Sequence, residues 1–230
     1  MRMIAMIPAR LGSKRISKKN IRYMIDKPLI QYPIELAVNS GLFESILVNS
    51  ESEELGRVAE TMGAKFHKRP PELATDTATN RDFTYEFCKK HACDYVIMVN
   101  PTSPLLKAET LANFVKFVEI SDYDTVLSTI SVQAESFYKG EPLNFTFAEK
   151  INSQLLEPVD EVIWAITAWR RDKFIENQEN GVNPVFGGKV GYFAIPKDES
   201  CDLDTLEEWR IAEGILLSRI NKQQERYLNL

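Results

Sequence analysis

Charged side chains gather at two places in the sequence, one near its start and one near its end. Arg10, Lys14 and Lys19 follow a short apolar run, and Asp202 and Asp204 precede a helix-like pattern. Cations beyond the end of a strand can bind phosphate, and paired carboxylates can hold a hard cation such as Mg²⁺. These two groups are the first candidates for a functional site.

The basic group lies in a loop that follows a buried strand. Residues Met3–Ile7 are all apolar without alternation, which predicts a strand covered on both faces, as in a parallel sheet under helices. Ligands of open α/β sheets bind beyond the carboxyl ends of the strands, so we expect the loop to meet an anion such as nucleotide phosphates. Gly12 is the only glycine in the first 40 residues, so neither a Walker loop nor G-x-G-x-x-G is present. A solvated basic loop is the alternative.

The acidic group has two interpretations. In extended chain, Asp202 and Asp204 point to the same side and could together hold Mg²⁺. Alternatively, Asp204 and Glu207 form the N-cap and capping box of the helix expected over residues 205–220. One carboxylate could cap the helix while the other meets the metal.

The basic loop carries a family resemblance. Its sequence, I-P-A-R-L-G-S-K-R-I-S-K-K-N, resembles the N-terminal motif of the N-acylneuraminate (CMP-sialic acid) cytidylyltransferases, although Ser17 stands where that family usually carries proline. The matching positions are Ala9, Arg10, Ser13, Lys14, Lys19 and Asn20. The resemblance implies that Ala9, Arg10, Gly12, Ser13 and Asn20 bind nucleotide. Arg10, Lys14 and Lys19 would cover the triphosphate.

A second matching segment is R-P-P-E-L-A-T-D-T-A-T-N, residues 69–80. By resemblance, Arg69, Thr77 and Asn80 contact the cytosine and ribose of CTP. A capped entry into the helix expected over residues 81–91 is the alternative from the residues alone.

A third matching segment, N-P-T-S-P-L-L, follows the most apolar strand pattern of the chain. By resemblance, Asn100, Thr102 and Ser103 bind the acidic sugar. Asn100 and Leu106 replace a glutamine and an arginine of the family, and Lys189 is the only cation near the late strand. We therefore include Lys189 among the candidate sugar ligands and leave the identity of the sugar open. At the acidic pair, the family's D-x-D-T motif implies that Asp202 and Asp204 bind Mg²⁺.

The periodicity predicts a single α/β domain over residues 1–230, with a three-layer, mostly parallel sheet flanked by helices. The resemblance implies a Rossmann-like nucleotidyltransferase fold. The expected strands are 3–7, 44–50, 64–67, 95–99, 124–132 and 189–195, and the expected helices are 28–43, 51–63, 81–91, 107–120 and 205–220. A capping box of Ser50 and Glu53 is expected at the second helix.

Regular alternation stops over residues 133–185, a stretch rich in aromatic side chains. Long irregular stretches in compact domains are usually functional or packed against another surface. The resemblance implies that this excursion protrudes, forms a homodimer and reaches the partner's site. A hairpin packed on its own subunit is the alternative.

Composition excludes several classes of protein. The net charge of −5 argues against binding nucleic acid duplexes. Apolar runs are too short for a membrane span, and the apolar segment at the start is too short for a signal peptide, so we expect a cytoplasmic protein. Three cysteines without C-x-x-C suggest neither disulfides nor structural zinc.

Together, the resemblance implies a cytidylyltransferase that transfers CMP from CTP to an acidic nine-carbon sugar of the sialic-acid type and releases diphosphate. Arg10, Lys14, Lys19 and Asp202 are the expected catalytic residues and Mg²⁺ is the expected cofactor. Transfer to an octulosonate or another acidic sugar, use of a different nucleotide, and a non-catalytic nucleotide-binding protein of the same fold remain alternatives.

Overall fold

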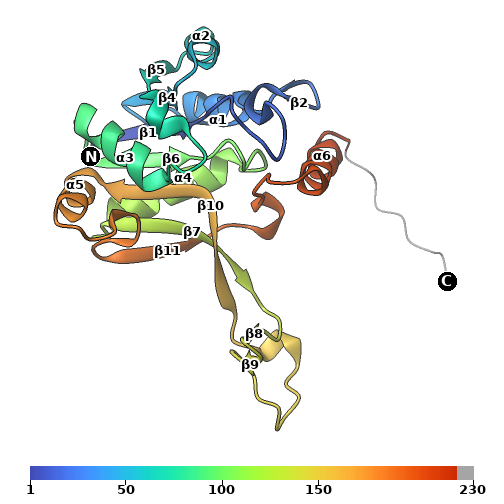
Figure 1. The fold of residues 1–230 in the computed structure, drawn as a ribbon. Coiled ribbons are helices and arrows are strands. Elements are labelled where there is room, and N and C mark those ends of the chain that lie inside the picture. The colour runs from blue at the N-terminus through green and yellow to red at the C-terminus, as the bar shows by residue number, and fades with distance from the viewer. Residues whose placement is uncertain (222–230) are drawn as a thin grey trace.

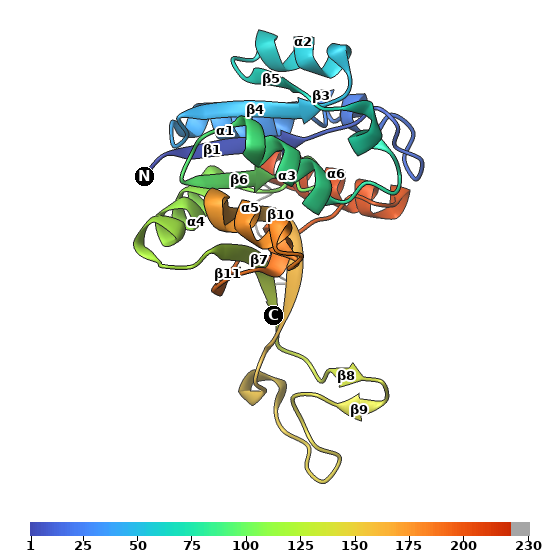
Figure 2. The ribbon, with the colours of Figure 1, turned by 60° about the vertical axis from the view of Figure 1, so that its left-hand side comes forward.

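One seven-stranded sheet forms the centre of the molecule (Figures 1 and 2). The structure is a computed structural model and describes residues 1–221. The strands of this sheet are β1 (Met3–Pro8), β4 (Ser45–Ser50), β5 (Lys65–Lys68), β6 (Tyr95–Val99), β7 (Thr125–Val132), β10 (Val159–Arg170) and β11 (Val190–Ala194). Their order across the sheet is β11-β7-β10-β6-β1-β4-β5.

The sheet is parallel except at β10. Strand β1 pairs in parallel with β4 and β6, and β5 extends the sheet beyond β4. Strand β10 runs antiparallel between β6 and β7, and β11 pairs in parallel with β7. Because β1, β4, β5 and β6 point the same way, the loops that follow them meet at one edge of the sheet.

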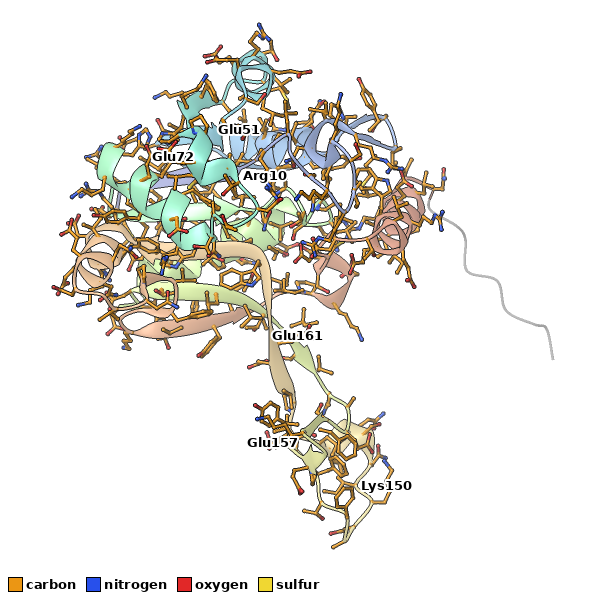
Figure 3. The ribbon with its side chains drawn as sticks, viewed as in Figure 1. Arg10, Glu51, Glu72, Lys150, Glu157 and Glu161 are labelled. Atoms are coloured by element: carbon orange, nitrogen blue, oxygen red, sulfur yellow. The ribbon has the colours of Figure 1, made fainter. Side chains whose placement is uncertain are left out.

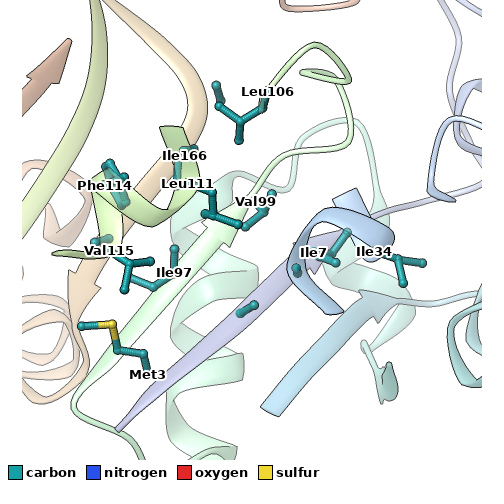
Figure 4. Packing of buried hydrophobic residues seen from close by; sticks show 14 of the residues in the cluster. Met3, Ile7, Ile34, Ile97, Val99, Leu106, Leu111, Phe114, Val115 and Ile166 are labelled. Atoms are coloured by element: carbon teal, nitrogen blue, oxygen red, sulfur yellow. The ribbon is translucent and has the colours of Figure 1, made fainter. Parts of the chain in front are cut away.

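Helices cover both faces of the sheet. They are α1 (Gln31–Ser40), α2 (Glu53–Thr61), α3 (Asn80–Lys90), α4 (Ala108–Ile120), α5 (Arg171–Glu179) and α6 (Leu206–Ile220). Helices α1, α2 and α4 pack on the face that carries Ile97 and Val99, whereas α3 and α5 pack on the face that carries Val96 and Met98. Figure 4 shows Phe114 of α4 on the first of these faces. The predicted three-layer α/β fold is thus confirmed.

A third apolar cluster attaches α6 to the basic loop. Ile16 of the loop, Leu203 and Trp209 are all buried in it. The cluster therefore brings the basic loop close to the segment that carries Asp202 and Asp204, although the two are far apart in sequence. No helix within residues 1–221 combines the length and apolar character required to cross a bilayer.

Two predicted helix caps are wrong by one or two residues. Helix α2 is capped by Ser52, whose hydroxyl accepts the Leu55 N–H at 3.3 Å, rather than by Ser50. Helix α6 has its capping box at Thr205 and Glu208, rather than at Asp204 and Glu207. Because Thr205 performs the capping, the Asp204 carboxylate is available for other contacts.

Residues 133–158, between β7 and β10, form an arm that projects from the body (Figures 1 and 2). It contains β8 (Phe137–Tyr138) and β9 (Glu141–Pro142), which pair with each other. The sequence predicts an irregular stretch up to residue 185. In its second half the structure differs, because β10 belongs to the main sheet and α5 packs on it. The short elements are β2 (Tyr23–Met24), β3 (Lys27–Pro28) and the 3₁₀ turns η1 (Lys19–Ile21), η2 (Pro71–Ala74), η3 (Ser153–Leu155), η4 (Pro184–Phe186) and η5 (Lys197–Glu199).

Candidate active site

A pocket of about 300 Å³ lies at the edge where the parallel strands end. It is lined from the loops after β1, β5 and β6, the start of α3, strand β10 and the segment before α6. Eleven of the predicted site residues line it: Ala9, Arg10, Ser13, Lys14, Lys19, Asn20, Arg69, Asn80, Asn100, Thr102 and Asp202. The structure therefore brings all three matching segments and the first carboxylate of the acidic pair around one cavity.

Four predicted residues lie close to this pocket without lining it. Gly12 is exposed in the basic loop, and Thr77 lies in the loop before α3, where its hydroxyl meets that of Thr75 at 3.2 Å. Ser103 is buried and donates to the Cys201 carbonyl at 2.6 Å, which holds the segment that carries Asp202. Asp204 faces the basic loop.

Lys189 lies elsewhere, and its prediction as a sugar ligand of this pocket is not supported. It directly precedes β11, and its backbone N–H donates to Asp124 at 2.9 Å while its ammonium pairs with Asp122 at 2.5 Å. Because β11 runs parallel to β7 and β7 points the same way as β6, residues before β11 lie at the opposite edge of the sheet.

Two buried side chains of the basic loop, Asn20 and Ile16, stabilise its conformation. The Asn20 side chain is buried and donates to the Arg10 carbonyl at 2.8 Å. Ile16, which the sequence analysis did not single out, is buried in the cluster under α6. Asn20 therefore supports the backbone of Arg10 in addition to lining the pocket.

An acidic residue from the neighbouring loop pairs with the first cations. Arg10 donates to the Asp76 carboxylate at 2.9 Å and to the Ala74 carbonyl at 3.3 Å, and Lys14 forms an ion pair with the same carboxylate. Hydrogen bonds from Lys14 and Arg10 lower the pKa of Asp76. Asp76 is not among the predicted site residues, although it stands inside the second matching segment. Its carboxylate lies where Arg10 and Lys14 could otherwise bind another anion.

The remaining cations contact the acidic pair. Arg15, another residue that the sequence analysis did not select, donates to Asp204 at 2.6 Å. Lys19 donates to the Leu203 carbonyl at 2.5 Å and lies 3.6 Å from the Asp204 carboxylate. Burial lowers the pKa of Lys19, while Asp204 and Asp202 favour its charged form. Lys19 thus links the two charged groups with which the sequence analysis began.

Asp202 differs from Asp204 in having no ion pair within 4 Å among residues 1–221. Burial raises the pKa of Asp202 and the Asp204 carboxylate raises it further, whereas Thr102 and the positive charge of Lys19 act in the opposite direction. A partly buried carboxylate beside a second carboxylate favours a nearby cation. Mg²⁺ commonly uses one or two carboxylates and completes its shell with water and substrate phosphates, so this acidic pair fits it. No group of three or more His, Cys, Asp and Glu side chains in the described part of the chain could hold a metal by itself.

Arg69 is the most deeply buried cation of the pocket, with 3% of its surface exposed. Its guanidinium lies over the ring of Phe83 at 4.3 Å and donates to Asn49. Burial lowers the pKa of Arg69 to about 10, which leaves it charged at neutral pH. Phe83 offers an aromatic face at the same wall of the pocket, and Asn80 begins the helix that carries it.

Figure 3 shows Arg10 on the body and Glu161 on β10, where the arm begins. A second cavity of about 390 Å³ lies near the base of the arm and shares Trp164 and Asp202 with the first. Its other lining residues are Glu161, Val162, Ile163, Ser200, Cys201, Glu208 and Ile211. In the part of the chain that the structure describes, this lining includes apolar side chains and carboxylates but neither lysine nor arginine. Leu106, by contrast, is buried in the main core and lines neither cavity.

Comparisons with known proteins identify the family of the chain. A family model described as cytidylyltransferase matches residues 4–205. The chain is 37% identical to CMP-N,N'-diacetyllegionaminic acid synthase of Legionella pneumophila, over 94% of this chain and 97% of that protein. It is 32% identical to N-acylneuraminate cytidylyltransferase A of Danio rerio, over 93% of this chain. The chain spans about half the length of that relative and of several other N-acylneuraminate cytidylyltransferases that it matches.

A solved structure of CMP:2-keto-3-deoxy-manno-octonic acid synthetase, complexed with CTP, has the same fold. It superposes with a TM-score of 0.71 at 17% identity and covers 95% of this chain and 100% of that one. The family match covers most of the chain and includes the strands, the loops and both charged groups of the pocket. The chain therefore belongs to the cytidylyltransferase family.

Proposed function

We propose that the protein transfers CMP from CTP to an acidic nonulosonic sugar and releases diphosphate. The observation that carries this proposal is that Arg10, Lys14, Lys19 and Asp202 open onto one pocket. In-line attack of a hydroxyl on the α-phosphorus needs two aligned reactants and stabilisation of developing negative charge. A pocket with cations on one wall and, on another, a carboxylate that forms no ion pair within residues 1–221 suits both requirements.

In this proposal, CTP lies across the carboxyl edge of the sheet. Arg69, Phe83 and Asn80 face the cytosine and ribose, while Arg10, Lys14 and Lys19 contact triphosphate oxygens. Asp76 leaves Arg10 and Lys14 when phosphate arrives, because both anions need the same cations. The buried loop contacts of Asn20 and Ile16 keep these cations in position before the nucleotide binds.

Asp202 and Asp204 would hold Mg²⁺ together with phosphate oxygens. The ion would neutralise charge at the α-phosphate and help to orient the attacking hydroxyl. Lys19 and Arg15 hold Asp204 in place through their contacts with it and with Leu203. Ser103 similarly holds the backbone beside Asp202.

The acceptor sugar would extend from Asp202 towards the second cavity. Apolar side chains such as Trp164 and Ile211 suit the acyl methyl groups of an N-acylated sugar, and Asn100 offers hydrogen bonds at the boundary. The relationship to the legionaminic acid synthase supports a di-N-acylated nonulosonic acid as the first candidate. An octulosonate is the second candidate, supported by the similarity in fold to the octonic acid synthetase.

A second subunit is part of the proposal. Among residues 1–221, the lining of the second cavity has no lysine or arginine, so in this proposal the carboxylate of the sugar takes its cations from the first pocket or from another chain. On the arm, Phe137, Leu143, Phe147 and Leu155 each expose more than half of their surface. Exposed apolar side chains clustered in this way usually mark an interaction site, and we propose that a second copy covers them.

Diphosphate release with CTP and Mg²⁺ tests the catalytic proposal across four sugars: N-acetylneuraminic, di-N-acetyllegionaminic, pseudaminic and 3-deoxy-octulosonic acids. We expect release with at least one nonulosonic acid and the highest kcat/KM with the di-N-acylated sugars. Release with none of the four would reject catalysis on these substrates. Thermal protection by CTP, compared with UTP, ATP and GTP, tests the nucleotide separately, and stronger protection by another nucleotide would contradict the choice of CTP.

A further inference from the structure

The end of β4 contacts both parts of the candidate nucleotide site. Asn49 is completely buried there. Its side-chain Oδ1 accepts from Arg69 Nε at 2.7 Å, and its backbone carbonyl accepts from Arg69 Nη2 at 2.6 Å. The same carbonyl also accepts the N–H of Ala9, at 3.0 Å, where the basic loop begins. One residue thus touches the buried arginine and the first residue of the phosphate-facing loop.

Glu51, two residues further on, holds the next part of that loop. Its carboxylate accepts the Leu11 N–H at 3.0 Å (Figure 3 labels Glu51 and Arg10). The backbone of Arg69 also contacts this segment, because its backbone N–H donates to the Ser50 carbonyl at 2.8 Å. The segment 49–51 therefore fixes Arg69 and the Ala9–Leu11 backbone to each other.

We infer that Asn49 is a positioning residue for the nucleotide, which fixes the plane of the Arg69 guanidinium and its separation from the phosphate-binding loop. This inference rests on the proposed function, because it takes Arg69 as the residue that faces the base. Neither the sequence motifs nor the lining of the pocket includes Asn49.

The physical reason lies in the geometry of the guanidinium. Its five N–H groups share one plane, so two acceptors from a single residue fix both position and orientation. The ring of Phe83, whose centroid lies 4.3 Å from Arg69 Cζ, packs against one face of the guanidinium and restrains its tilt. If the buried Nε–H lost its acceptor, the Arg69 side chain would have to move to find another one. The arginine is therefore held in its binding direction before the nucleotide arrives, which reduces the ordering cost of binding.

The test compares Asn49→Leu, which keeps the approximate size but removes the acceptor, with Asn49→Asp, which restores an oxygen at the same place. Leu47→Val is the matched control, because Leu47 is buried in the same strand and on the same face. The readouts are the Kd of CTP by calorimetry, the preference for CTP over UTP, and KM and kcat. Melting temperatures show whether each variant is folded.

We expect Asn49→Leu to weaken CTP binding and raise its KM by about ten-fold or more, with a smaller change in kcat and a reduced preference for CTP over UTP. Asn49→Asp should recover most of the affinity and the preference. Leu47→Val should lower the melting temperature without changing either. Equal effects of Asn49→Leu and Leu47→Val on affinity and base preference would overturn the inference.

Two further measurements separate the possible failures. If Asn49→Leu does not fold, Asn49→Ser removes the reach of the acceptor with less apolar bulk, and unchanged CTP affinity and base preference in that variant would overturn the inference. Calorimetry does not need turnover, so the effect of Asn49 on CTP binding is measurable even if no sugar is a substrate. A wild-type protein that binds CTP without releasing diphosphate contradicts the proposed reaction and leaves the inference about Asn49 testable.

Discussion

At the scale of single residues, most charged side chains at the pocket already form ion pairs within the protein. Arg10 and Lys14 share Asp76, and Arg15 and Lys19 meet Asp204. Asp202 has no such partner within the described residues. The unpaired carboxylate is therefore the acidic residue most open to a cation brought by the substrate.

Asp202→Asn should remove most activity while the protein stays folded. The amide cannot supply the negative charge that favours Mg²⁺, so we expect kcat to fall by at least about 100-fold with a smaller change in the Kd of CTP measured without metal. Asp198→Asn is a matched control, because Asp198 lies in the same segment but pairs with Lys107 away from the pocket. Activity of Asp202→Asn close to that of Asp198→Asn would contradict the role proposed for Asp202.

Asp76→Asn should have the opposite effect on the nucleotide. It keeps the size of the side chain and removes the anion that, in the proposed binding mode, competes with phosphate for Arg10 and Lys14. We therefore expect a few-fold lower KM for CTP. A higher KM would show that Asp76 instead helps to hold the cations in place.

At the scale of elements, the direction of a strand decides whether a residue can join the site. The apolar runs and the loops after them predict that the segments at residues 9–20, 69–80 and 100–103 meet at one edge, because parallel strands end together. The same rule would have placed Lys189 at the other edge, since it precedes its strand. Ion pairs such as Asp76 with Lys14 depend on how two loops fold towards each other, which no local pattern specifies.

Strand β10 shows a second limit of prediction from sequence. It is separated from the strands before it by the arm and runs antiparallel between β6 and β7. Its pairing with β7 is interrupted between Val162 and Thr167, so it does not alternate as an ordinary strand does. Its sequence therefore resembles that of the irregular arm, and Trp164, which lines both cavities, is not among the predicted site residues.

Two histidines in contact, His67 of β5 and His91 at the end of α3, should make the stability of the fold depend on pH. His67 contacts His91 at 2.9 Å and Glu86 at 2.7 Å. Burial lowers the pKa of both histidines from the ordinary 6.5, against the opposing effect of Glu86. The folded protein then binds fewer protons than the unfolded chain below about pH 6.5, so stability is complete above that pH and falls as the pH drops further.

Melting temperatures between pH 7.5 and pH 5.5, both about one unit from that ordinary value, measure this effect. We expect a decrease towards acidic pH that is smaller in His91→Gln, since glutamine keeps a hydrogen-bonding group without a titrating ring. Carboxylates such as Asp82, whose pKa is lowered, contribute only at more acidic pH. An identical decrease in both proteins would contradict the histidine explanation.

At the scale of the whole molecule, the arm extends two strands of the body into solvent, and Lys150 and Glu157 lie along it in Figure 3. Phe137, Phe145 and Phe147 contact one another there, with ring centroids 5.0 to 6.0 Å apart. Phe137 and Phe147 nevertheless remain 56% and 74% exposed. Their mutual contacts hold the three rings in a fixed arrangement while leaving apolar surface exposed, and such a surface suits binding to a partner protein.

Phe147→Asp should shift the protein towards a monomer in light scattering coupled to size exclusion. A charge placed in an apolar interface costs desolvation, so the dimer is disfavoured. Ile120→Asp is the control, because Ile120 is similarly exposed, at 76%, but lies at the end of α4 on the body. Equal masses for wild type and Phe147→Asp would argue against a dimer formed through this cluster.

The pairing of the loop cations with the protein's own carboxylates has one more consequence. In the proposed binding mode, a nucleotide that enters the pocket would displace Asp76 from Arg10 and Lys14, instead of releasing counterions of the buffer. Added sodium chloride should therefore weaken CTP binding less than it would if Arg10 and Lys14 were unpaired before the triphosphate binds. Asp76→Asn should make CTP binding more sensitive to ionic strength.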